Sequence, residues 1–319
     1  MNEVIVKEYA DGISAVDALY HGRVGHSAIH VVVENGHAAV IDTGTNYSIP
    51  LLIEALGQNG IAPEQVDYVI VTHVHLDHAG GAGECMRRFP NARLVVHPKG
   101  ARHMIDPAKL VAGTVGVYGA EKTRQVYGEI LPIAAERVIE APDDFSVSLA
   151  GRELRFLDTP GHARHHFCVY DGQSGSVFSG DVFGLSYREF DVDGHPFVYP
   201  ATTPVQLDPA ELHKSIDRLM ALDPRQIYLT HYSRVAELER LADDLHRRLD
   251  DFTALARGVG GAGEERHRRL MERLESYLLE KLDAHGCRLP HEKSLHILSG
   301  DADLNAQGLE VWLDKQAGV

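Results

Sequence analysis

A dense group of metal-binding residue types lies in the segment Thr72–Gly81. Six consecutive positions hold three histidines and one aspartate, namely His73, His75, Asp77 and His78. On an extended turn His73 and His75 can point to one side, while the other two residues swing away as a helix begins. Because four such neighbours compete for space around one tetrahedral ion, the spacing favours two adjacent metal ions. A polar loop that binds no metal is the alternative.

Three further metal-type residues each follow the end of a predicted strand, and they are His162, Asp181 and His231. An aspartate after glycine is commonly a turn former or a helix N-cap, and a single histidine at a strand end is commonly an ordinary residue. Taken together, however, the three supply what the first cluster lacks. They offer a third histidine for one ion, a carboxylate that can bridge, and a third ligand for the other ion.

An alternation of strand and helix signals over the first 230 residues positions these groups. The continuous apolar run Tyr68–Val71 predicts a buried strand that delivers Thr72-His73 at its C-terminal end. Two β-rich runs flank Asn35-Gly36, which predicts a hairpin. Residues 99–131 contain many Gly and Pro residues and weak periodicity, so they predict a mobile insertion. The remaining expected strands are 94–96, 154–157, 167–170, 177–178 and 227–229, and the expected helices are 49–56 and 207–222.

The pattern changes after His231. Apolar residues recur at spacings of three and four from Leu238 to Leu255, all of them leucines except Phe252, and leucines recur every four residues from Leu270 to Leu282, on either side of a flexible break at Gly258–Gly263. Such spacing predicts two amphipathic helices. We therefore expect a catalytic domain over residues 1–234 and a helical C-terminal extension over residues 235–319, which serves as a lid or joins a homodimer.

The composition limits the class of partner. The 319 residues include 20 histidines, and 31 basic against 46 acidic residues give a net charge of −15. This charge disfavours nucleic acid, because nucleic-acid binders usually carry a basic stripe. The three cysteines form no CxxC pair, so a thiolate metal cluster is not expected. The N-terminus lacks signal-peptide features and no apolar stretch approaches ~20 residues, so the expectation is a cytoplasmic protein that does not enter a membrane.

The chain resembles the metallo-β-lactamase-fold hydrolases. Four motifs stand in the order of that family: HVHLDHAGG at 73–81, TPGH at 159–162, SGD at 179–181 and TH at 230–231. The resemblance covers roughly residues 15–234. It implies an α/β fold, specifically an αββα sandwich with the site at one edge between two sheets.

The resemblance also implies a ligand set. His73, His75 and His162 would bind the first ion, Asp77, His78 and His231 the second, and Asp181 would bridge the two. Asp42 matches a turn that orients the ligand histidines, and His166 matches a second histidine that supports the site. A set of nitrogen and oxygen ligands favours two Zn²⁺ ions, with Fe or Mn as alternatives.

The implied reaction is hydrolysis of a carbonyl compound by a hydroxide that bridges the two metals. Asp77 would orient the hydroxide and pass a proton to the leaving group. The expected substrate is a small acyl compound or lactone: a lactone, ester or thioester. An iron-dependent redox enzyme and a phosphodiesterase remain alternatives. The 49 residues between Asp181 and His231 leave no room for the inserted domain of the nuclease branch.

No subfamily of hydrolase is matched closely. Gly184 stands where some lactonases of the family carry tyrosine, and Tyr232-Ser233 departs from the glyoxalase II pattern after the last histidine. An aromatic-rich stretch directly follows Asp181, and it includes Phe183, Tyr187 and Tyr199. We expect these three residues to line the substrate pocket, with ordinary core packing as the alternative.

Overall fold

The computed structural model describes residues 4–203 and 205–317 and divides the chain into two compact units. The first unit contains the residues up to Asp158, together with His165–Gly180 and Pro224–Arg234. The second contains Thr159–Arg164, Asp181–Asp223 and the residues from Val235 onward. The chain therefore passes between the units several times, and the single division at residue 234 stays a prediction.

A seven-stranded sheet in the order β1-β2-β3-β4-β5-β6-β7 forms one layer of the first unit. The predicted hairpin is present, since β3 and β4 pair antiparallel and Asn35 and Gly36 both have positive φ angles, as a tight hairpin turn requires. Strands β4, β5, β6 and β7 run parallel, so their carboxyl ends share one edge of the sheet. The strands are β1 (Val6–Glu8), β2 (Ile13–Asp17), β3 (Ala28–Glu34), β4 (His37–Ile41), β5 (Val66–Ile70), β6 (Arg93–Val96) and β7 (Val138–Glu140).

A six-stranded sheet in the order β13-β12-β11-β10-β9-β8 forms the second layer of this unit. Strands β11 and β12 are parallel, so Gly180 and Leu229 end at the same edge. The strands are β8 (Ser146–Leu149), β9 (Arg152–Asp158), β10 (Phe167–Asp171), β11 (Ser176–Gly180), β12 (Gln226–Leu229) and β13 (Ser233–Val235).

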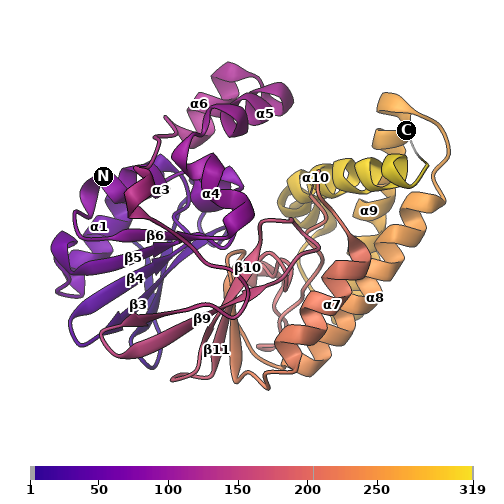
Figure 1. Cartoon of the computed structure of the whole chain (residues 1–319). Coiled ribbons are helices and arrows are strands. Elements are labelled where there is room, and N and C mark those ends of the chain that lie inside the picture. The colour runs from indigo at the N-terminus through magenta and orange to yellow at the C-terminus, as the bar shows by residue number, and fades with distance from the viewer. Residues whose placement is uncertain (1–3, 204, 318–319) are drawn as a thin grey trace. The chain divides into compact units, whose positions relative to one another are not determined.

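The two sheets of the first unit pack through a shared apolar core, in which Ile41 and Ile70 of one sheet join Phe156 and Phe178 of the other. Helices α1, α3 and α4 cover the opposite face of the seven-stranded sheet (Figure 1). This arrangement confirms the predicted α/β fold with two sheets. The helices of this unit are α1 (Ile49–Gln58), α2 (Leu76–Ala79), α3 (Ala82–Arg88), α4 (Pro98–Ile105), α5 (Ala108–Tyr118) and α6 (Ala120–Tyr127).

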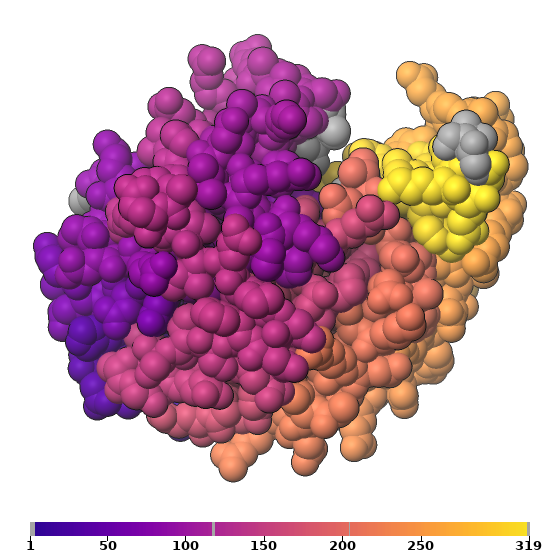
Figure 2. Space-filling model, viewed as in Figure 1, coloured from indigo at the N-terminus to yellow at the C-terminus, as the bar shows by residue number. Residues whose placement is uncertain are grey.

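The segment 99–131 forms most of α4 and all of α5 and α6, helices that its weak periodicity does not predict, and its mobility stays a prediction. Three of its Gly and Pro residues mark helix ends, since Pro107 precedes α5, Gly119 separates α5 from α6, and Gly128 follows α6, whereas its other glycines lie inside α4 and α5. Buried contacts of Ala101 and Met104 with the core hold α4 in place. In Figure 2 this violet segment lies at the surface of the first unit.

Four helices make up most of the second unit. Asp208 caps helix α7 (Pro209–Met220) by accepting a hydrogen bond from the Glu211 backbone N–H, and Pro209 is the first residue of this helix. The predicted C-terminal helical region is confirmed, and the leucines of its two rows are buried except for the partly buried Leu255. None of the described helices is long and apolar enough to cross a membrane. The helices are α7 (Pro209–Met220), α8 (Leu238–Arg257), α9 (Gly263–His285) and α10 (His291–Ala317).

Candidate metal centre

The loop after β5 sets the directions of the histidine cluster. His75 is extended, with φ −63° and ψ 146°, and it is the residue before the one-turn helix α2. His73 and His75 therefore leave an extended segment, whereas Asp77 and His78 leave the first turn of a helix. This is the change of backbone direction that the spacing predicts.

Asp42 organises the buried end of the cluster from its position after β4. Its Oδ1 accepts hydrogen bonds from the Thr72 backbone N–H at 2.8 Å and from Thr72 Oγ1 at 3.0 Å. Its Oδ2 accepts from His78 Nδ1 and from Thr230 Oγ1, both at 2.7 Å. A buried carboxylate with this many donors is held rigidly, so it fixes the His78 ring.

Three candidate ligand histidines of the first unit, His73, His78 and His231, are oriented through Nδ1. His78 Nδ1 donates to Asp42, and His231 Nδ1 donates to the backbone carbonyl of His26 at 2.8 Å. His73 Nδ1 lies 3.2 Å from Thr72 Oγ1. This hydroxyl oxygen can accept a hydrogen bond from the imidazole N–H while its own O–H donates to Asp42. A neutral imidazole protonated on Nδ1 carries its lone pair on Nε2. In each of these rings Nε2 is therefore the atom that could bind a metal ion.

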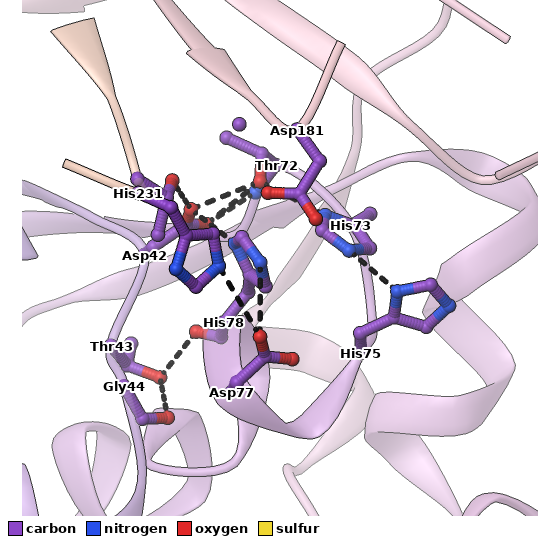
Figure 3. Close-up of polar contacts among 12 residues, drawn as sticks. Asp42, Thr43, Gly44, Thr72, His73, His75, Asp77, His78, Asp181 and His231 are labelled. Atoms are coloured by element: carbon purple, nitrogen blue, oxygen red, sulfur yellow. Dashed lines mark hydrogen bonds and ion pairs between the residues drawn. The ribbon is translucent and has the colours of Figure 1, made fainter. Parts of the chain in front are cut away.

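The ligand atoms of Asp77, His78 and His231 converge on one point (Figure 3). Asp77 Oδ2 lies 3.5 Å from His78 Nε2 and 3.4 Å from His231 Nε2. Around a tetrahedral zinc with bonds of 2.0–2.1 Å, ligand atoms lie about 3.3 Å apart. The spacing of the three side chains therefore fits a single ion.

His73 and His75 form a second pair of facing nitrogens in the same loop. His73 Nε2 lies 2.8 Å from His75 Nδ1 (Figure 3). The buried ring of His166 stacks beside His73 with a centroid distance of 5.0 Å. Gly180, at φ +50°, makes room here, because a Cβ on it would lie 2.5 Å from His166 Nε2 and 2.7 Å from Thr72 Oγ1. This contact explains why a residue without a side chain precedes Asp181.

The second unit brings His162 and Asp181 together. His162 Nε2 lies 3.4 Å from Asp181 Oδ2, and His162 Nδ1 donates to the Ala201 carbonyl at 3.0 Å. The turn before His162 requires glycine, because Gly161 has φ +127° and a Cβ there would lie 2.4 Å from the Leu212 backbone nitrogen. The pair repeats the pattern of the first unit, with Nδ1 on an acceptor and Nε2 facing a carboxylate at a separation suited to metal.

The aromatic residues after Asp181 are packed inside the second unit. Phe183, Tyr187 and Tyr199 are fully buried. The two tyrosine hydroxyls donate to Asp301 Oδ2 of α10 at 3.0 and 2.7 Å. Burial, and then the neighbouring Asp301 carboxylate, raise the pKa of Tyr199 well above its usual value. Their role in a substrate pocket stays a prediction.

Several residues of the site are absent from the sequence-based prediction. The hydroxyls of Thr72 and Thr230 both donate to Asp42, and each threonine directly precedes a candidate ligand histidine. The repeated Thr-His dipeptide is the signal that could have found them. No sequence signal marks the ring of His165, which lies 5.8 Å from that of His75.

Comparison of the whole sequence with known protein families agrees with this arrangement of side chains. Residues 22–231 match the family described as the Metallo-beta-lactamase superfamily. The chain belongs to this superfamily. The match covers about two thirds of the chain and confirms the family that the four motifs resemble.

Among curated members of the superfamily, the chain is 26% identical over 219 residues to the metallo-beta-lactamase fold-containing protein ST1585 of Sulfurisphaera tokodaii, covering 65% of this chain and 77% of that protein. It is 28% identical over 146 residues to a hydroxyacylglutathione hydrolase of Synechococcus, covering 46% and 43% of the two chains. It is 27% identical over 193 residues to the acyl-coenzyme A thioesterase MBLAC2 of Gallus gallus, covering 55% and 64%. The chain thus spans less than two thirds of the length of both named enzymes.

Solved structures of superfamily members share the fold. The structure of ST1585 from Sulfolobus tokodaii has a TM-score of 0.65 at 21% identity, covering 95% of this chain and 99% of that one. The Flv1 flavodiiron core from Synechocystis has a TM-score of 0.56 at 17% identity, covering 80% and 62%. At these identities the likeness concerns the fold alone.

Proposed function

We propose that the protein is a dinuclear metal-dependent hydrolase that cleaves an acyl compound at its carbonyl carbon. His73, His75 and His162 would hold one ion, and Asp77, His78 and His231 the other. Asp181 would bridge the two ions. This set is the one that the superfamily resemblance implies, and it contains no thiolate.

The convergence of Asp77, His78 and His231 is the observation that carries the proposal. Three ligand atoms from two distant segments lie within 4.8 Å of one another, and two of their separations match a tetrahedral shell. Their rings are held by Asp42 and by a backbone carbonyl, as metal-binding histidines usually are. Two imidazoles and a carboxylate suit Zn²⁺, and they also suit Fe or Mn.

Chain connectivity supports the assignment of Asp181 to the same centre. Gly180 ends β11 and lies against Thr72 and His166. One peptide bond joins it to Asp181, and consecutive Cα atoms are about 3.8 Å apart. Asp181 therefore directly follows a residue that packs against Thr72 and His166.

The bound ions would lower the pKa of a water molecule and polarise the substrate carbonyl. The protein itself contributes orientation and proton transfer. Asp77 directs Oδ2 at the two Nε2 atoms, and its carboxylate can accept a proton from the attacking water and pass it to the leaving group. Asp42 and the His26 carbonyl keep His78 and His231 in the tautomer that this arrangement needs.

An acyl thioester is the substrate class that the relatives favour. The names hydroxyacylglutathione hydrolase and acyl-coenzyme A thioesterase both specify an acyl group. The net charge of −15 makes nucleic acid an unsuitable substrate. Esters and lactones share the electrophilic carbonyl, so they belong to the same proposal.

Metal analysis coupled to a substrate panel tests the proposal. The purified chain is assayed for metal content and for hydrolysis of acyl-thioesters, aryl esters, acyl-homoserine lactones and a phosphodiester. We expect about two zinc ions per chain and hydrolysis of at least one carbonyl substrate. Iron with oxygen consumption would replace the proposal with a redox enzyme, and activity on the phosphodiester alone would replace it with a phosphodiesterase.

A further inference from the structure

A second cluster of histidines lies in the second unit, between helices α7 and α8. His213 of α7 and His246 of α8 face each other with their Nδ1 atoms 2.6 Å apart. Their rings are nearly parallel, at 12°, with centroids 4.9 Å apart. The separation of the centroids means that the two Nδ1 atoms meet edge to edge and that the rings do not lie face on face. Two nitrogen lone-pair positions are thus directed at the same small volume.

Each ring of this cluster has a carboxylate on its other nitrogen. His213 Nε2 lies 3.2 Å from Asp250 Oδ1 of α8, and His246 Nε2 lies 3.1 Å from Asp217 Oδ1 of α7. Each histidine therefore pairs with an aspartate from the opposite helix. A carboxylate on the far nitrogen is the usual partner of a metal-binding histidine, because it fixes the tautomer and raises the basicity of the ligand atom.

We propose that His213 and His246 form an additional binding site for a divalent transition metal such as Zn²⁺, with Asp250 and Asp217 as orienting partners. Imidazole nitrogens suit Zn, Cu and Ni, whereas Mg²⁺ takes oxygen ligands. Water would complete the coordination, since both histidine side chains are about one quarter exposed. The site is independent of the proposed dinuclear centre, because it shares no residue with it.

A count of the ring protons shows what an ion would replace in this cluster. The metal-free cluster has three hydrogen-bonding contacts, namely Nδ1 to Nδ1 and one carboxylate contact for each ring. Three such bonds need three ring protons, the number that one neutral imidazole and one imidazolium carry together. An ion in place of the central proton would bind both Nδ1 lone pairs. Each Nε2–H would keep its hydrogen bond to a carboxylate.

The geometry needs only a small adjustment to admit an ion. Nitrogen ligands of a tetrahedral zinc lie about 3.3 Å apart, so the two Nδ1 atoms must separate by about 0.7 Å. Rotation of two partly exposed side chains supplies this movement without a change in the helices. The sequence contains the same signal twice, since His213-x-x-x-Asp217 and His246-x-x-x-Asp250 place each pair one helical turn apart.

Equilibrium dialysis of the full chain against Zn²⁺ tests the proposal. We expect the double variant His213→Gln/His246→Gln to bind one equivalent fewer than the parent protein, with the metal of the dinuclear centre and the hydrolase activity unchanged. Asp250→Asn should weaken this one equivalent by 10–100-fold. His291→Gln is the matched control, because His291 forms an exposed pair with Asp283 at 2.9 Å and pairs with no second histidine among the described residues.

Thermal unfolding with and without Zn²⁺ gives an independent readout. An ion that joins α7 to α8 should raise the Tm of the parent protein and of His291→Gln more than that of the double variant, and Mg²⁺ should not reproduce the difference. Equal zinc stoichiometry in the parent and the double variant would overturn the proposal. The difference in stoichiometry is read whether or not the dinuclear centre forms, so failure of one proposal is distinguishable from failure of the other.

Discussion

The Asp42 carboxylate accepts a 2.7 Å hydrogen bond from the buried imidazole of His78, and the same oxygen accepts from the Thr230 hydroxyl at 2.7 Å. The aspartate follows β4, the histidine lies in α2, and the threonine follows β12. One carboxylate therefore joins three segments behind the ligand atoms. The orientation of His78 depends on this buried contact.

Replacement of Asp42 by asparagine tests that dependence. Asparagine has a similar size and tolerates the left-handed backbone of this position, where φ is +56°. Its amide group carries only one acceptor oxygen, so one pair of donors loses its partner. We expect metal affinity to fall 10–100-fold and stability to fall by about 1–3 kcal/mol. Metal content and chemical denaturation measure the two effects.

The control for this variant is Asp67→Asn. Asp67 forms an exposed contact of 3.0 Å with His37 Nδ1 in the same unit, so it repeats the Asp–His pairing away from the site. We expect little change in metal content or stability. An Asp42→Asn protein with unchanged metal affinity would show that Asp42 does not position the ligands.

Removal of a proposed ligand should remove metal and activity together. We expect His75→Ala and Asp181→Ala to abolish hydrolysis and to lower the metal content below that of the parent protein, because each loses a donor of the small ligand set. Elemental analysis and the carbonyl substrate panel measure both quantities. His37→Ala is the control, since it removes an exposed histidine. Full activity with a full metal complement in either ligand variant contradicts the assignment.

The glycine before Asp181 should be intolerant of a side chain. In Gly180→Ala the new Cβ would lie 2.5 Å from His166 Nε2 and 2.7 Å from Thr72 Oγ1, so these two side chains must shift. Gly60→Ala is the matched control, because Gly60 also has a positive φ, +70°, but has no atom within 4 Å of a Cβ position. We expect Gly180→Ala to be less stable than Gly60→Ala by about 1–3 kcal/mol and to bind less metal. Equal stability of the two variants would show that the contact is relaxed at no cost.

The burial of His30 should make the free energy of unfolding depend on pH in the acid range. Its ring, on β3, is fully buried beside the stacked rings of Phe178 and Tyr228, and Nε2 has no hydrogen-bond partner among the described residues. Burial lowers the pKa of His30 from 6.5 to about 4, although the charge of Asp42 raises it slightly. His30 of the unfolded chain therefore takes up a proton as the pH falls below 6.5, whereas His30 of the folded chain takes it up only near pH 4. Stability falls across this window as pH falls, by about 3 kcal/mol.

The variant His30→Phe should flatten that part of the profile. Unfolding free energy is compared at pH 7 and pH 4 for both proteins, with a chelator present so that metal loss does not contribute. His37→Ala serves as the exposed control and should retain the slope of the parent. Identical pH profiles for the parent and His30→Phe would show that another group accounts for acid destabilisation.

The sequence predicts the strand ends that carry the candidate ligands because apolar runs and turn residues are local signals. Tyr68–Val71 lies over most of β5, and the Asn35-Gly36 turn joins β3 to β4 as expected. The weak periodicity of the segment 99–131 does not predict its helices, because Pro107, Gly119 and Gly128 lie at helix ends and burial of Ala101 and Met104 outweighs the weak pattern. Propensity decides such segments only where tertiary packing does not.

By itself the sequence determined the residue types, their order along the chain and their superfamily, since motif spacing is a property of the chain alone. Only the tertiary structure decided which nitrogen of each histidine faces a ligand position. That choice depends on acceptors far away in sequence, such as the His26 carbonyl for His231 and the Asp42 carboxylate for His78. The pairing of His213 with His246 has the same origin, because 33 residues separate them and only the packing of α7 on α8 brings their rings together.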